Sequence, residues 1–159
     1  MKDPESAYQR LVPDAVCYQY DIGVLVSQLR QAATHKQRKT VERLIHALKE
    51  ACKGSLDTLE YAQIQLECGR AAYAIEKKEL AFQSIELAIA ILAPIVNCSN
   101  EHRHFHGVAL WMQGLLLHEQ KNLSLKALEY FKSSLAEFEI LALPYQAIWP
   151  TTEWYHAAI

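Results

Sequence analysis

Three histidines close together are the most conspicuous side chains in the sequence that could bind a metal. They are His102, His104 and His106, and Cys98 lies four residues before the first of them. In a helix the first and last histidines would share one face, and with the Cys98 thiolate they could hold a soft metal such as zinc. The alternative is a polar first helical turn capped by Ser99 or Asn100. A zinc site needs three or four ligands that converge on one point, and no such converging set is evident from the sequence, so we expect no metal site.

A cluster of basic residues is a second group that could bind a ligand. Its members are His35, Lys36, Arg38, Lys39 and Arg43. Such a cluster could contact phosphates. More often such a cluster is a solvated hairpin turn next to a helix start. No aromatic residues are interleaved with it, as single-strand binders require, and the net charge of the chain is -2. We therefore do not expect nucleic acid as the partner.

The sequence contains none of the short motifs that carry catalysis or cofactor binding. There is no G-x-S-x-G, no H-E-x-x-H and no glycine-rich phosphate loop. We therefore expect no enzyme and no cofactor. A helical enzyme assembled from scattered residues stays open as a third class of function, beside a binding module and a regulatory module.

The composition is that of a helical globular protein. Of 159 residues, 51% are hydrophobic and 21% charged, with only five Gly and five Pro. The four cysteines lie far apart and form no C-x-x-C pair, which is typical of buried thiols in a reducing compartment. No signal peptide is visible, and the apolar run 87–96 is too short to cross a membrane. We expect a cytoplasmic protein with no membrane partner.

Apolar residues spaced by three and four predict helices along the whole chain. Val41, Leu44, Ile45 and Leu48 form one such stripe, and no segment alternates as a strand would. The predicted fold is all-α, a single domain over 1–159 made of stacked antiparallel helical hairpins with about seven helices. The hairpins are expected at 21–54, 57–94 and 100–143, followed by a terminal helix at 144–159.

The second and third hairpins repeat one pattern. Gly69 and Gly114 lie 45 residues apart (69 to 114), and Ala81 and Ala127 lie 46 apart (81 to 127). Two helices cross closely only where side chains are small, so these four positions should mark the crossings. A bulky residue four positions after each alanine, Ile85 or Phe131, should fill the space beside them.

Two segments resemble tetratricopeptide repeats: CGRAAYAIEKKELAFQSIELAIAILAP and MQGLLLHEQKNLSLKALEYFKSSLAEFE. The family pattern has a small residue, an aromatic one three positions later, a turn, and then Ala, a bulky residue and Ala. Matching positions are Gly69, Ala72, Ala81, Ile85, Ala88 and Pro94 in the first segment, and Trp111, Gly114, Leu117, Ala127, Phe131 and Ser134 in the second. The spacing here exceeds the usual 34 residues, and Ala72 replaces the aromatic residue.

This resemblance implies an α-solenoid that binds a peptide or helix of another protein in a concave groove. The phrase FEILALPYQA is similar to repeat junctions in large bacterial signal-transduction regulators. The alternative function is therefore a regulatory or sensor module of a larger bacterial signalling or transcription system.

The anchor glycines predict which residues line that groove. One helical turn either way from Gly69 and Gly114, the candidates for partner binding are Gln63, Arg70, Tyr73, Trp111, Leu115 and His118. Aromatic residues and arginine carry much of the energy at protein interfaces. The alternative is that Tyr73 and Trp111 belong to the core.

The end of the chain is rich in aromatic residues. A solenoid normally ends in a polar capping helix, but this tail contains Trp149, Trp154 and Tyr155. We expect these three residues to form a self-association surface, which would give a homodimer. The alternative is that the tail folds back as a lid on the last hairpin.

Overall fold

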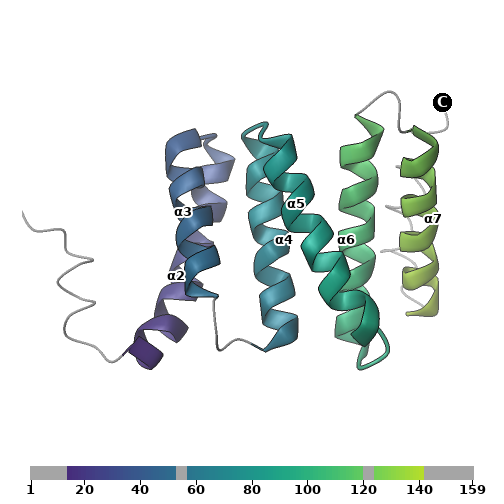
Figure 1. The fold of residues 1–159 in the computed structure, drawn as a ribbon, viewed down its shortest axis with the longest axis horizontal. Coiled ribbons are helices and arrows are strands. Elements are labelled where there is room, and N and C mark those ends of the chain that lie inside the picture. Colours follow the sequence, from purple (N-terminus) through teal and green to yellow (C-terminus); the bar gives the residue numbers. More distant parts are fainter. Residues whose placement is uncertain (1–13, 53–56, 120–123, 142–159) are drawn as a thin grey trace, which may run out of the picture.

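The computed structural model describes residues 14–52, 57–119 and 124–141, which form six α-helices, one short 3₁₀ helix and no strand (Figure 1). The α-helices are α2 (Asp14–Thr34), α3 (Arg38–Ala51), α4 (Thr58–Ala74), α5 (Lys78–Leu92), α6 (Asn100–His118) and α7 (Ser124–Ile140), and η1 (Ala93–Ile95) follows α5. The all-α prediction is confirmed. The helix predicted at 144–159 lies outside the described residues.

The helices pair in sequence order. α2 packs on α3, α4 on α5 and α6 on α7, and neighbouring hairpins meet through α2 and α3 with α4 and through α5 with α6. In Figure 1 the hairpins stand in a row, with α3 and α5 in front of α2, α4 and α6. The first helices α2 and α4 pack directly on one another, whereas α4 touches α6 at only a few positions and α5 makes most of the contact with α6.

The predicted start of the first hairpin was wrong. It was expected at residue 21, but α2 already includes the residues from Asp14 onward. α3 begins at Arg38, two residues after the left-handed turn residue Lys36. The capping of α6 was predicted correctly.

The turns of the first two hairpins have the same geometry. Lys36 and Glu76 have positive φ angles of 52° and 63°. In each turn the following N–H donates to a carbonyl five residues earlier, at 3.0 Å in the first hairpin and 2.9 Å in the second. This is the Schellman arrangement that ends a helix with a left-handed residue. The turn of the first hairpin thus repeats that of the second with an offset of 40 residues (36 to 76).

The predicted crossings are confirmed. A Cβ added at Gly69 would lie 2.6 Å from Cγ1 of Ile85, and one added at Gly114 would lie 2.5 Å from Cε1 of Phe131. Ala81 and Ala127 are fully buried. Each bulky residue therefore occupies the space that the missing side chain leaves, and the two hairpins cross in the same way.

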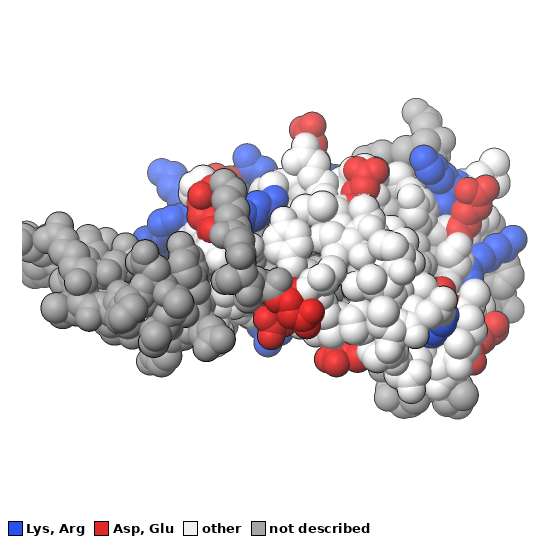
Figure 2. All heavy atoms as spheres, turned by 60° about the horizontal axis from the view of Figure 1, so that its bottom comes forward, with Lys and Arg blue, Asp and Glu red and all other residues white. Residues whose placement is uncertain are grey.

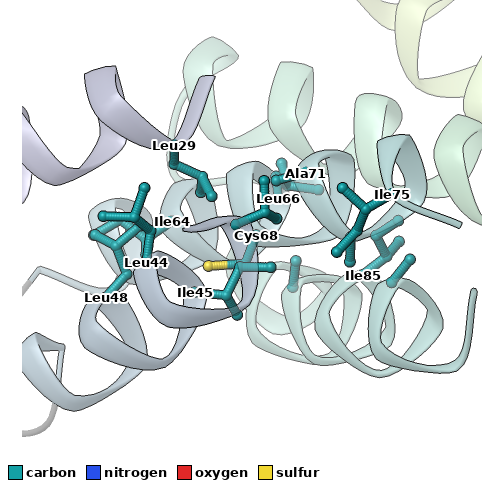
Figure 3. Close-up of a cluster of buried hydrophobic side chains, with 14 of the residues drawn as sticks. Leu29, Leu44, Ile45, Leu48, Ile64, Leu66, Cys68, Ala71, Ile75 and Ile85 are labelled. Atoms are coloured by element: carbon teal, nitrogen blue, oxygen red, sulfur yellow. The ribbon is translucent and has the colours of Figure 1, made fainter. Parts of the chain in front are cut away.

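One core runs through all three hairpins. It begins at Leu25 on α2, includes the residues shown in Figure 3 from α2, α3, α4 and α5, and reaches Leu116 on α6. Contiguous buried side chains of this kind fix neighbouring helices relative to one another. The surfaces of the first helices are consequently held in a defined register.

Candidate partner-binding surface

α4 lies in the middle of the stack and reaches solvent along a single stripe. Its outermost residues recur at three-four spacing: Glu60, Gln63, Glu67, Arg70 and Tyr73. Adding 45 to the α4 numbers gives the α6 residues Phe105, Val108, Met112, Leu115 and His118, of which Met112 is buried; the half-buried Trp111 lies one position before Met112 and is counted with this stripe. We call these two stripes, with the matching α2 residue Arg30, the first-helix face.

The structure places all six predicted partner-binding residues on the first-helix face. Arg70 and Tyr73 are exposed, the latter by 38%. Gln63, Trp111, Leu115 and His118 are half-buried. Three of them come from α4 and three from α6. The predicted self-association residues Trp149, Trp154 and Tyr155 lie outside the described residues.

A polar bridge joins the two stripes at one end. The Tyr73 hydroxyl donates to the carboxylate of Glu119, the residue that ends α6, and Lys78 Nζ lies 3.1 Å from the other carboxylate oxygen. Partial burial opposes ionisation of Glu119, but the hydrogen bonds from Tyr73 and Lys78 prevail and lower its pKa. Tyr73 is thus held beside the end of α6 by an ionised carboxylate.

The two arginines of the face differ in their partners. Arg30 on α2 forms a forked pair with Glu67 on α4, with Nε–Oε2 at 3.1 Å and Nη2–Oε1 at 2.5 Å. This hydrogen-bonded carboxylate raises the pKa of Arg30. Arg70 is the equivalent residue one hairpin later, and in the described part of the chain it has no ion pair or hydrogen bond. The α6 residue that corresponds to Glu67 is Met112, which cannot accept a pair from Arg70.

The α6 stripe is apolar and leans on the core of the third hairpin. Trp111 and Leu115 pack against the buried cluster of Leu117, Ala127 and Phe131. Trp111 therefore serves the core as well as the face, so the interface and core interpretations both apply to it. The first-helix face has a charged part on α2 and α4 and an apolar part on α6.

The histidine run is dispersed among separate partners. His102 Nδ1 lies 2.6 Å from the hydroxyl of Ser99, which caps α6 by accepting from the His102 N–H. The ring of His104 lies edge-on to Phe138, with centroids 5.8 Å apart. His106 Nδ1 is 3.8 Å from a carboxylate oxygen of Glu137. Within the described ranges no three potential metal ligands converge.

His106 belongs to a charged cluster that ties α6 to α7. Glu137 pairs with Arg103 at 3.0 Å, and all three side chains are largely buried. Burial lowers the pKa of His106, although the Glu137 carboxylate beside it acts in the opposite direction. The cluster has a structural position between two helices and lies away from the Tyr73–Glu119 end of the face.

The basic cluster is divided by the fold. Arg38 turns toward the second hairpin and donates from Nη2 and Nε to the carbonyl of Ile75 at 2.9 and 3.2 Å. His35 and Arg43 instead line an open pocket of about 260 Å³ with glutamine side chains between α2 and α3. Arg38 thus holds two hairpins together, a role that the sequence cluster alone did not indicate.

The second helices present a different kind of surface. Figure 2 shows few charged side chains over the middle of the face that it presents. At the end of α5 and in η1 the exposed residues include Leu87, at 40% exposure, Ala90 and Pro94. This end of α5 therefore presents several exposed apolar residues to solvent, with the exposed Glu86 beside them.

Comparisons with protein-family models, curated proteins and solved structures find no match for this chain. In the part that the structure describes, no helix combines the length and apolar character needed to cross a membrane.

Proposed function

We propose that this chain is a tetratricopeptide-like interaction module that binds a peptide or helix of another protein on its first-helix face. The observation that carries the proposal is the pair of aligned stripes on α4 and α6. They combine an exposed arginine and tyrosine with half-buried tryptophan and leucine, the mixture that interface hot spots favour.

The scaffold also supports this function. The shared core and the Tyr73–Glu119 bridge hold the two stripes in place before a partner arrives, which reduces the entropy lost on binding.

Site-specific photo-crosslinking tests the proposal. A photoreactive phenylalanine analogue replaces Tyr73, which keeps an aromatic ring at that position. The matched control places the same analogue at Glu86, an exposed residue of α5. In native lysate we expect one protein to be captured from position 73 and not from position 86, with mass spectrometry identifying it.

Two other results would redirect the interpretation. Capture from position 86 alone would move the binding surface to the second helices and refute the proposal. A small molecule that raises the melting temperature while position 73 captures no protein would instead favour the regulatory or sensor alternative.

A further inference from the structure

Building on the proposed function, we propose that the partner segment places an acidic side chain against Arg70 and an apolar side chain against the α6 stripe. The occupant is a peptide or helix of another protein in which the two kinds of residue lie on one side. The junction between the first two hairpins contains an arginine–carboxylate pair that the next junction lacks.

The first junction provides the template. There the guanidinium of Arg30 lies against the Glu67 carboxylate through two hydrogen bonds. A planar guanidinium matches a carboxylate in this forked geometry better than it matches other groups. Arg70 has the same place in the repeat on α4 that Arg30 has on α2, and both arginines are exposed on their first helix.

At the second junction the carboxylate is absent. Met112 stands where Glu67 stands one hairpin earlier, and it is buried. Two acidic residues of the face already have partners, because Glu67 pairs with Arg30 and Glu119 accepts from Tyr73 and pairs with Lys78. The third, Glu60, lies ten residues before Arg70 on α4. Arg70 has no counter-charge among the described residues, and a partner carboxylate would supply one.

The neighbouring stripe defines the rest of the partner. Where α4 offers Gln63 and Arg70, α6 offers Val108 and Leu115 at the corresponding positions. Apolar side chains of a partner gain by covering such residues, whereas a second charge there would lose its hydration without a partner. An amphipathic segment satisfies both halves of the face.

Peptide selection provides the test. A phage-displayed library of random short peptides is selected on the full chain, and the winners are synthesised and measured against wild type, Arg70→Glu and the control Arg43→Glu. We expect the winners to combine Asp or Glu with aromatic or aliphatic residues. Their affinity should fall at least about tenfold in Arg70→Glu, and little in Arg43→Glu.

Charge reversal makes the test specific. When the acidic residue of a selected peptide is replaced by lysine, the peptide should bind wild type more weakly. The same peptide should regain much of its affinity for Arg70→Glu. Circular dichroism of each variant checks that the helices persist. Winners that bind wild type and Arg70→Glu equally would overturn the inference.

The position of crosslinking separates this failure from failure of the proposed function. Selected peptides that crosslink at position 73 but bind Arg70→Glu as tightly as wild type would refute only the acidic contact. Winners that crosslink at position 86, or a library that yields no binder, would count against both. Self-association of the wild type that Arg70→Glu abolishes would identify a second copy as the occupant and overturn the separate partner.

Discussion

The second and third hairpins are built alike but present unlike surfaces. Gly69, Ala81 and Ile85 make the same crossing as their counterparts 45 and 46 residues later. Yet α4 shows solvent a charged stripe and α6 a largely apolar one. The positions that set the crossing are constrained by volume, whereas the exposed stripe is free to vary. Differences between the stripes are therefore the better guide to function.

The largest expected effects come from emptying the two crossings. Phe131→Ala should lower the free energy of unfolding by about 3–5 kcal/mol and Ile85→Ala by about 2–5 kcal/mol, since both side chains are almost completely buried. Urea denaturation followed by circular dichroism measures both. Leu125→Ala, at a residue 81% exposed, is the control and should change little. If only one of the two variants lost little stability, the two crossings would not be equivalent in energy.

These crossings could be predicted from sequence because they depend on local side-chain volume and helical spacing. The six residues proposed for the face were chosen by helical spacing from Gly69 and Gly114, and their role in binding stays a prediction. The junction contacts could not be predicted, because Arg38 with Ile75 and Arg30 with Glu67 depend on how one hairpin sits on the next. The offset of 40 between the first two hairpins had a signal, since Ala32 and Ile45 match Ala72 and Ile85.

Adding a methyl group at the two crossing glycines should affect the stability of the two hairpins differently. At Gly114 an added Cβ meets three ring atoms of Phe131 at 2.5, 2.7 and 3.0 Å, whereas at Gly69 the atoms nearest to it are two from the side chain of Ile85, at 2.6 and 3.1 Å. A rigid ring yields less than an aliphatic chain. Overpacking costs about 1–3 kcal/mol and alanine gains up to about 1 kcal/mol in helix propensity.

We therefore expect Gly114→Ala to lower the melting temperature clearly and Gly69→Ala to lower it less. Gly23→Ala is the control, because no atom lies within 4 Å of its added Cβ, and it should be neutral or stabilising. A larger drop in melting temperature for Gly69→Ala than for Gly114→Ala would show that the crossing in the third hairpin is packed less tightly than that in the second.

Buried glutamines offer a way to stabilise each hairpin. Gln113 on α6 is 1% exposed with Oε1 and Nε2 both unpaired, and Gln65 on α4 is 2% exposed with Oε1 unpaired, counting partners among the described residues. A buried polar atom without a hydrogen bond costs about 1–3 kcal/mol. Gln113→Met should raise the free energy of unfolding by about 1 kcal/mol, and Gln65→Met by less.

Chemical denaturation of the two methionine variants and wild type measures this difference. A destabilised Gln113→Met variant would mean that its amide has a partner, such as a bound water, in solution.

Acidification should affect the third hairpin more than the second, with the smallest effect of the series. His106 lies in the charged cluster with Arg103 and Glu137, whereas the corresponding residue of α4 is Tyr61. Its pKa is lowered by burial from the ordinary 6.5, so below that pH the unfolded chain binds a proton more readily than the folded one. Stability should therefore fall as the pH drops through about 6.5 toward the lower folded value.

Melting curves between about pH 7.5 and about pH 5.5 measure this loss. His106→Tyr, which copies the second hairpin, should reduce the pH dependence, while His35→Tyr, at an exposed position, should leave it unchanged. Because Glu137 favours the charged imidazole and Arg103 opposes it, the sign depends on burial prevailing. A melting temperature that rises on acidification, and does so through His106, would show that the Glu137 carboxylate outweighs burial in this cluster.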